Sequence, residues 1–541
     1  MLANDRDNDK IATITDNVNI NEPTDFDKAI STTGYGLFNV LLLLAALPIT
    51  WTAVFDTTTG AFILASAECD LELTFFRKGV LVAFPYIAIT TTAFIWDYIT
   101  PHVSMKTLFI LALLGDAILN IVSSGVQSYY IFLLVKFVSG IFAGGPLAMV
   151  MTYLTEFHSA KYKPRFATWA GFLFVVANIV PAALAFTILP LNWHIDIFGR
   201  DYSSWRIYLL ICSIPPVVGL VTATMLPESP KYLMAIGRSD AALKLLRRIY
   251  CMNTRQPSET FPIKALLVRQ KTQLARPVLE ASLERMRVSL YNTKLLLTTT
   301  ANLPAFCFVS FLQFGSMLGF HTMRLWIPHL FIIINNFDAD NWTPEDRKPT
   351  ICEMLDPHAA LPSRRYLNCS NFDSMCIEWT VRPVIYRNST IIAASAVIFS
   401  FLVGFIMTTK LRKQIILLTA FLISVASSFG INWAQSPPYM LTLAAAVLVT
   451  TRITGNIVTA VNVDVIPVPL RATSTSILTN IGNLAAIAGN LIFSALLNTE
   501  CIIAFTGLGC FFSACFFVSL FFPQPVRESS KKLAEASTSK A

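Results

Sequence analysis

The sequence carries little charge. Only 14% of its 541 residues are Asp, Glu, Lys or Arg, and 54% are hydrophobic, whereas a soluble domain has about 25% charged residues. This composition excludes an ordinary soluble protein. The chain instead contains many apolar runs of roughly 18 or more residues, which indicate membrane-spanning helices. A membrane β-barrel is excluded, because its strands would appear as segments of about 10 residues with alternating polarity.

Several chemical motifs are also missing. The chain has no Gly-x4-Gly-Lys-Ser/Thr phosphate-binding loop, so it supplies no ATPase of its own. It has no metal-ligand spacing and no nucleophile elbow. We therefore expect no enzyme, no cofactor and no metal site. The acidic first 33 residues lack the basic segment and short apolar core of a cleaved signal peptide.

The net charge of +8 does not indicate nucleic-acid binding. Lys and Arg gather in turns between apolar runs, and such a bias marks the cytoplasmic side of a membrane protein. The longest basic stretch follows the segment Met225–Leu233, in which Pro227 and Pro230 end a helix because proline has no N–H to donate. This stretch extends to Lys294. We expect it and both termini to be cytoplasmic.

Twelve spans are predicted, six on each side of this central loop. They are expected at residues 35–65, 75–96, 107–126, 129–153, 166–189, 205–226, 300–334, a segment ending near 407, 414–433, 439–463, 472–497 and 502–522. The predicted fold class is an all-α membrane protein with two pseudo-symmetric six-helix bundles. The expected regions are a cytoplasmic tail at 1–33, an N-terminal bundle at 34–226, a central cytoplasmic loop at 227–296, a C-terminal bundle at 297–522 and a cytoplasmic tail at 523–541.

A polar loop at 336–388 is predicted on the outer side. It holds three glycosylation sequons, at Asn341, Asn368 and Asn388. Asn368 is the first choice, because Asn388 lies close to the membrane and a proline follows the first sequon. The cysteines expected on this side are Cys69, Cys352, Cys369 and Cys376. A disulfide among them is expected, but its connectivity does not follow from the sequence. The other cysteines are interpreted as core or lipid-facing residues.

The two halves repeat a charge pattern. Glu156 and Lys163 follow the fourth span and Asp464 and Arg471 follow the tenth, with the same spacing in both pairs. Six-span repeats around a central cavity are typical of secondary transporters. Ion pairs near the cytoplasmic ends of the helices would hold an inner gate closed. The charged residues expected in this gate are Asp97, Lys106, Lys136, Glu156, Lys163, Arg165, Glu228, Lys231, Lys410, Lys413, Asp464 and Arg471.

The fourth span also carries Gly140, Gly144 and Gly145. Glycines four residues apart share one helix face and let another backbone approach closely. We interpret them as a packing seam.

Charges inside a bilayer are costly and usually functional. Asp56 in the first span and Arg324 in the seventh are therefore the main candidates for substrate binding. One hypothesis places them together as an ion pair that a charged substrate or a proton breaks. The alternative is a structural pair, or an arginine that extends to the outer interface. His321, Trp326, Asn456 and Phe174 are secondary candidates for substrate binding, and His321 is of a type that titrates near neutral pH.

Several stretches of the chain match motifs of a known family, at 64–70, 78–79, 136–145, 155–157, 204–206, 227–231, 326–328 and 464–471. Through them residues 35–523 resemble the major facilitator superfamily, and within it the family of synaptic vesicle glycoprotein 2 and related proteins. The resemblance implies a transporter fold. The turn after the second span keeps only Asp97 and a displaced Lys106 of the superfamily motif, and Lys136 replaces an arginine. Gly455 and Phe174 stand where the family has ligand-site tryptophans, so the family's drug site is not carried over.

Two functions remain open at this point. The first is secondary active transport of a small polar or charged organic solute by alternating access. The alternative is a transporter-like vesicle protein that acts mainly by binding partners, through the central loop or the 336–388 loop. The expected location is the plasma membrane or an intracellular vesicle membrane.

Overall fold

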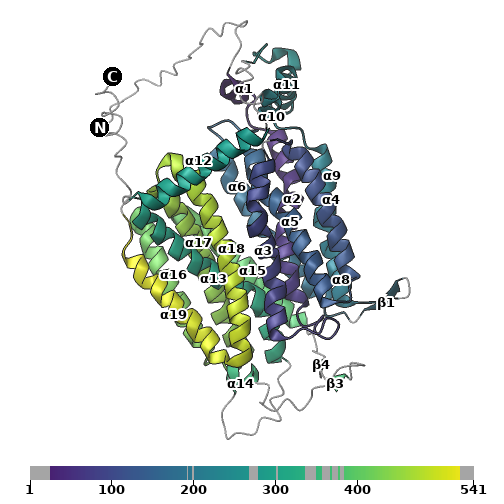
Figure 1. The fold of residues 1–541 in the computed structure, drawn as a ribbon, viewed down its shortest axis with the longest axis vertical. Helices are drawn as coiled ribbons and strands as arrows, with labels where there is room; N and C mark the ends of the chain where they lie inside the picture. Colours follow the sequence, from purple (N-terminus) through teal and green to yellow (C-terminus); the bar gives the residue numbers. More distant parts are fainter. Residues whose placement is uncertain are drawn as a thin grey trace, which may run out of the picture.

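The computed structural model describes residues 25–523, except 101, 192, 198–199, 267–277, 300–301, 336–348, 356–365, 368–375, 378–382 and 408. Twelve of its helices are long and apolar enough to cross a membrane (Figure 1). This confirms the twelve predicted spans and the all-α class. The β-structure in the described residues is limited to two short hairpins.

The N-terminal half contains six spans and one hairpin. Its fifth span is divided at Ala177 and Asn178, and its sixth at Ser213, where Pro215 and Pro216 begin a new helix. Proline is tolerated in the first turn of a helix but not within a preceding one. The helices are α1 (Phe26–Thr32), α2 (Leu37–Ile63), α3 (Phe75–Ile99), α4 (Met105–Ser124), α5 (Tyr129–Thr155), α6 (Lys163–Val176), α7 (Ile179–Ile188), α8 (Ser204–Cys212) and α9 (Ile214–Met225), with strands β1 (His194–Ile197) and β2 (Arg200–Ser203).

The central loop and the C-terminal half follow. The loop contributes α10 (Pro230–Ala235), α11 (Ser239–Thr254), η1 (Ser258–Thr260) and α12 (Val278–Thr298). The C-terminal half contains α13 (Leu303–Asn335), α14 (Ile351–Leu355), β3 (Tyr366–Leu367), β4 (Cys376–Ile377), α15 (Pro383–Ile406), α16 (Lys410–Ile431), α17 (Pro437–Val465), η3 (Val468–Leu470), α18 (Arg471–Thr499) and α19 (Cys501–Leu520).

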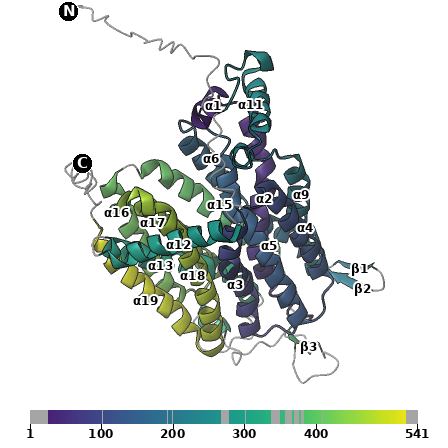
Figure 2. The same ribbon diagram turned by 45° about the horizontal axis from the view of Figure 1, so that its top comes forward.

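The two halves stand side by side, with α2–α9 on one side and α13–α19 on the other (Figures 1 and 2). The helices α1, α10 and α11 lie at one end of the molecule, which we call the α11 end. The opposite end carries α14 and both hairpins, and we call it the α14 end. The α11 end is the one predicted to be cytoplasmic, because it holds the basic central loop.

Three apolar clusters form the core. One lies toward the α14 end and contains residues of both halves, from Phe55 to Phe512. The second draws only on residues 29–266 and the third only on residues 296–515. The halves therefore share a core toward the α14 end, whereas toward the α11 end each half has its own.

Glycines set the closest helix contacts. A Cβ atom at Gly140 of α5 would lie 2.9 Å from Ala88 Cβ and 3.0 Å from Pro85 O, both on α3. The predicted glycine seam is thus confirmed, with α3 as its partner. Gly79 plays the same part between the halves, because a Cβ atom there would lie 2.1 Å from Ser494 Oγ of α18. Only a residue without a side chain allows these approaches.

The central loop is fixed to the N-terminal half. Asn253, at the end of α11, accepts a hydrogen bond from Phe38 N at 3.0 Å and donates one to Asn39 Oδ1 at 3.0 Å. The Asn39 amide nitrogen in turn lies 3.0 Å from His158 Nε2. These contacts hold α11 at the start of the first span.

A disulfide joins Cys352 of α14 to Cys501 at the start of α19. This corrects our interpretation of Cys501 as a core or lipid-facing residue. The turn between the last two spans places Cys501 at the α14 end, where α14 docks by a bond from Ile351 N to Ala434 O of 2.9 Å. Cys69 is also disulfide-bonded.

Candidate functional site

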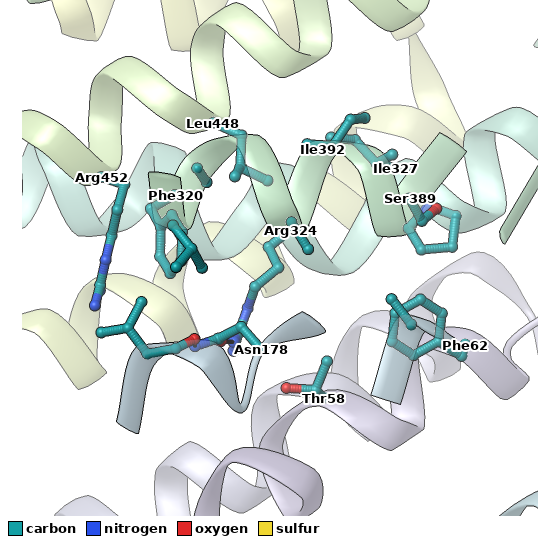
Figure 3. A pocket seen from close by; sticks show the side chains of 16 residues that line it. Thr58, Phe62, Asn178, Phe320, Arg324, Ile327, Ser389, Ile392, Leu448 and Arg452 are labelled. Atoms are coloured by element: carbon teal, nitrogen blue, oxygen red, sulfur yellow. Dashed lines mark hydrogen bonds between the residues drawn. The ribbon is translucent and has the colours of Figure 1, made fainter. Parts of the chain in front are cut away.

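A pocket lies between the two halves (Figure 3). It encloses about 540 Å³ of space, including its open part. Helices of both halves supply its wall. The lining residues are Thr58, Phe62, Val175, Asn178, Ala182, Phe320, Arg324, Ile327, Pro328, Ser389, Ile392, Ala393, Ala396, Val397, Leu448 and Arg452.

Helical periodicity presents these side chains to one space. Phe320, Arg324 and Ile327 follow the spacing of one helix face on α13, because residues three and four apart are neighbours on a helix surface. Asn178 comes from the break between α6 and α7. Its side chain donates to Val175 O at 2.9 Å and so crosses the interrupted turn.

Arg324 connects the halves. Its guanidinium donates to Asn178 Oδ1 at 2.5 Å and to the hydroxyl of Tyr86, on α3, at 2.6 Å. Its Nε is buried without a hydrogen-bond partner. The Tyr86 hydroxyl also lies 3.1 Å from His321 Nδ1. Arg324 is therefore held by neutral groups of the opposite half.

Asp56 lies elsewhere, in a buried polar cluster of the N-terminal half. We define this cluster as Asp56, Asp116, Asn120, Lys136 and Ser139. Asn120 Nδ2 donates to Asp56 Oδ1 at 2.9 Å, and Lys136 Nζ donates to Asn120 Oδ1 at 2.8 Å. Among the described residues, Asp56 forms no ion pair with Arg324, which differs from our hypothesis. Asp56 is packed among α4 and α5, whereas Arg324 faces α3 and α7.

The hydrogen count in this cluster is informative. Ser139 Oγ lies 3.0 Å from Asp56 Oδ2 and 2.5 Å from Asp116 Oδ1. A hydroxyl has one hydrogen and donates one bond. Both contacts are hydrogen bonds only when one carboxyl is protonated and donates to Ser139 Oγ. One additional proton would thus make both contacts of Ser139 hydrogen bonds, while Asp116 Oδ2 is buried without a hydrogen-bond partner.

The other predicted substrate residues lie around the pocket rather than in its wall. Trp326 is fully buried and stacks on Phe75 with ring centres 6.5 Å apart. Asn456 donates to Ser400 Oγ at 2.5 Å, between α17 and α15. His321 contacts Tyr86, and Phe174 packs in the core of the N-terminal half.

Polar contacts also close the α14 end. Lys78 Nζ lies 2.8 Å from Glu68 Oε2 and 3.2 Å from His329 Nε2. Lys78 and Glu68 belong to the N-terminal half and His329 to the C-terminal half, and both Lys78 and His329 are only 1% exposed. We call these three residues, with Phe75 and Trp326, the α14-end seal.

Part of the expected charge network is present at the α11 end. Lys413 and Asp464 form an ion pair of 2.5 Å in the C-terminal half, and Arg471 Nε donates to Ile466 O at 3.0 Å. In the N-terminal half Glu156 accepts a hydrogen bond from Ser229. Lys136 is not in this network, because it lies in the buried polar cluster.

Two of the remaining residues predicted for the gate lie near the starts of helices. Lys106 is in the first turn of α4, and Glu228 precedes α10. Burial raises the pKa of Glu156, while the Ser229 hydroxyl, Lys231 and Lys163 oppose this shift. The side chains of Asp97, Arg165 and Lys410 are outside the described residues.

The glycosylation predictions have different outcomes. Asn388 lies within α15 and its side chain is 8% exposed, so the structure argues against a glycan there. Asn341 and Asn368 lie outside the described residues. In the described part of the chain no group of His, Cys, Asp and Glu is placed to hold a metal ion.

Sequence reasoning missed three residues of these sites. Arg452 and Asp116 are charges within predicted spans, so the rule that selected Asp56 and Arg324 could have found them as well. Asn178 gave no such signal, because its role depends on the break between α6 and α7.

Comparison with known proteins agrees with this architecture. Residues 56–317 match the family described as "Sugar (and other) transporter". Synaptic vesicle glycoprotein 2B of Rattus norvegicus is 29% identical over 244 residues, which cover 44% of this chain and 36% of that protein. The Homo sapiens protein of that name is 31% identical over 209 residues, covering 38% of this chain and 30% of the relative. The matched regions thus span about a third of these relatives.

Solved structures share the fold at low identity. A partially occluded, inward-open structure of the xylose transporter XylE from E. coli has a TM-score of 0.62 at 14% identity, covering 90% of this chain and 100% of that one. The same transporter, described as a major facilitator superfamily proton:xylose symporter and bound to 6-bromo-6-deoxy-D-glucose, has a TM-score of 0.57 at 15% identity, covering 90% and 95%. These matches are carriers or vesicle glycoproteins rather than enzymes, as expected. The chain thus has twelve apolar helices in the fold of these transporters, and its sequence is similar to the sugar transporter family and to the synaptic vesicle glycoproteins 2.

Proposed function

We propose that this protein is a secondary active transporter that moves a small polar or charged organic solute by alternating access. The observation that supports this most strongly is the pocket, whose wall comes from both halves. A site between two halves that rock against each other is the arrangement on which alternating access depends. The proposed location is the plasma membrane or a vesicle membrane, with the α11 end and both termini cytoplasmic.

The contacts between the halves are the ones that the proposed cycle would break and re-form. In this state the shared core and the α14-end seal close one side. Arg324 holds the pocket wall together through Asn178 and Tyr86 of the other half. A bound solute would compete for the Arg324 guanidinium. Binding would then change the contacts between the halves, which couples occupancy to rocking.

We also propose that a proton is carried by Asp56 and Asp116. Two carboxyls that share Ser139 and Asn120 repel each other when both are ionised, and Lys136 supplies only one positive charge. One retained proton would let Ser139 Oγ form a hydrogen bond with both carboxyls. A proton gradient would supply the energy when this proton is exchanged with only one side at a time.

The test is uptake by cells that express the full-length chain at their surface. The panel contains labelled sugars, organic cations, organic anions and amino acids. We expect uptake of at least one class above that of mock-transfected cells. Arg324→Ala should reduce it by about tenfold or more, because a lost charged contact is worth about 1.4 kcal/mol or more. Arg387→Ala, at an exposed arginine of α15 outside the pocket, is the matched control.

Surface expression without uptake of any class would contradict a carrier. The partner-binding alternative would then be favoured, and binding to the central loop or to the 336–388 loop would be the next measurement. Uptake that is unchanged in the Arg324→Ala variant would support a carrier. It would also show that the solute does not bind in this pocket during transport.

A further inference from the structure

The charged side chains of the pocket are all of one sign. Arg324 and Arg452 are the ionisable residues in its wall, and none of the described lining residues is acidic. The proposed transport cycle gives Arg324 a role but does not explain a second cation, Arg452, at this place. Their surroundings decide what they are suited to bind.

Both guanidiniums lie against one aromatic ring. The guanidinium carbon of Arg452 is 5.0 Å from the centre of Phe320, and that of Arg324 is 5.4 Å from it. Figure 3 shows Phe320 between the two side chains. Contact with an aromatic face offsets part of a cation's desolvation cost. It does not neutralise the charge.

Among the residues that the structure describes, neither arginine has a carboxylate partner. Arg324 is bonded to the amide of Asn178 and the hydroxyl of Tyr86, and its Nε remains unpaired. Within the described part of the chain, the contact found for Arg452 is the one with Phe320. The buried acids Asp56 and Asp116 of the N-terminal half are occupied in the buried polar cluster.

Two uncompensated cations inside a membrane protein are costly. An anionic ligand would lower this cost, because it supplies the counter-charge and accepts hydrogen bonds from guanidinium N–H groups. A cationic ligand would raise it. A neutral ligand would leave it unchanged.

The rest of the wall is apolar. Phe62, Ile327, Ile392 and Leu448 line the same space, with only Thr58, Asn178 and Ser389 as neutral polar groups. Phe62 and Ser389 lie on the opposite side of the pocket from Arg452 in Figure 3. The pocket thus has a cationic side and a mainly apolar side.

We infer that the pocket binds a small organic anion, with its carboxylate or similar group held by Arg452 and Arg324 and its apolar body toward Phe62. This inference rests on the proposed function and names its substrate class. Binding and transport are separable, so each can fail without the other.

The binding test uses three probes of one shape and different charge: benzoate, benzamide and benzylammonium. Thermal unfolding of the purified full-length protein in detergent is measured with increasing amounts of each. A ligand that binds only the folded state raises the midpoint temperature. We expect a rise with benzoate, and little or none with the other two.

Variants locate the anion. Arg452→Gln should weaken benzoate binding by about tenfold or more, the size expected for a lost charge-assisted contact. Arg452→Lys should lose less, because the charge remains. Arg387→Gln, an exposed arginine of the same half, should bind as the unmodified protein does. Circular dichroism checks that each variant is folded.

The outcomes distinguish the two proposals. Benzoate binding that depends on Arg452, without uptake of any solute class, would uphold the anion site and contradict the transporter. Uptake of a sugar or a cation that benzoate does not inhibit would keep the transporter and overturn the anion site. Equal stabilisation by chloride and benzoate would also overturn it, because the site would then select charge without an organic body.

Discussion

At the scale of single residues, Ser139 is the side chain on which the proposed proton of the buried polar cluster depends. Its hydroxyl faces Asp56 and Asp116 at once, and it has one hydrogen to donate. The second contact needs a proton on a carboxyl. This makes the protonation state of the Asp56–Asp116 pair a property of three side chains that can each be changed.

Asp116→Asn should remove the pH dependence of uptake. An asparagine amide donates without being protonated, so this variant mimics the protonated pair permanently. We expect the uptake of the unmodified protein to change severalfold between about pH 5.5 and about pH 7.5, as it does when an essential group titrates. The variant should give a flat profile. Uptake of the labelled solute at a series of outside pH values measures both.

Asp240→Asn is the control for this experiment, because Asp240 is exposed in the first turn of α11. It should keep the profile of the unmodified protein. A normal pH profile in Asp116→Asn would show that the pair is structural and carries no coupling proton.

From the sequence, only the charged residues of these sites could be predicted. A charge within an apolar run is visible in the sequence, so Asp56 and Arg324 could be selected, and Arg452 and Asp116 could have been. Their partners could not be predicted, because Asp56 meets Asn120 and Ser139 through the packing of α2 against α4 and α5. The expected Asp56–Arg324 pair failed for this reason.

At the scale of elements, the link between α5 and α10 is the feature that best explains the Pro227–Pro230 stretch. Ser229 accepts a hydrogen bond from Tyr232 N, which caps α10, and it donates to Glu156 at the end of α5. Tyr153 donates to Pro227 O at 2.6 Å. The stretch therefore fixes the start of the central loop to the fourth span.

Glu156→Gln should stabilise the protein at neutral pH. Burial raises the pKa of Glu156 above its ordinary value of 4.5, so the folded state binds this proton more tightly than the unfolded chain does. The associated stability is present below pH 4.5 and is lost as the pH rises through the folded pKa. Glutamine removes this loss and still accepts the Ser229 hydrogen bond.

Thermal unfolding of the purified protein at several pH values tests this. The Glu156→Gln variant should unfold roughly 1–4 °C higher at about pH 7.5, the shift expected from about 1 kcal/mol in a large domain. The difference should shrink towards about pH 4.5, where both proteins are neutral at this position. Glu259→Gln, at an exposed glutamate, should show no such trend. A gap that widens on acidification would contradict the burial argument.

Element positions were easier to predict than their ends and breaks. Length and hydropathy were sufficient for twelve spans, because a membrane requires about 20 apolar residues per helix. The break at Ser213 is marked in the sequence by Pro215 and Pro216, whereas Asn178 is a single polar residue inside an apolar run and does not by itself indicate a break. The pairing of Cys352 with Cys501 depends on the docking of α14, which the sequence does not indicate.

At the scale of the whole molecule, the two halves are joined toward the α14 end and have separate cores toward the α11 end. The repeat of charges predicted two bundles, but not which end of them is closed. That difference arises from contacts between the halves, among them Lys78 with His329 and Gly79 with Ser494. Alternating access requires these contacts to open.

Gly79→Trp should hold the α14 end open. Even a Cβ atom at this position would lie 2.1 Å from Ser494 Oγ, so an indole forces α3 and α18 apart. Uptake should fall by about tenfold or more, since a cycle that cannot close one end stops there. A cysteine introduced by His329→Cys, buried in the seal of the unmodified chain, should then react with a membrane-impermeant maleimide, as quantified by mass spectrometry.

Gly507→Trp is the matched control, because the same side chain would meet nothing within 4 Å of its Cβ atom on α19. It should leave uptake and labelling as they are in the protein with His329→Cys alone. Anion binding gives a second measurement that separates a trapped protein from a misfolded one. A trapped Gly79→Trp protein keeps Arg324 and Arg452 and should retain a measurable benzoate-dependent rise in its unfolding temperature. Loss of uptake without any gain in labelling at position 329 would show that the indole does not open the α14 end. The α14-end seal would then not be the contact that opens during the cycle.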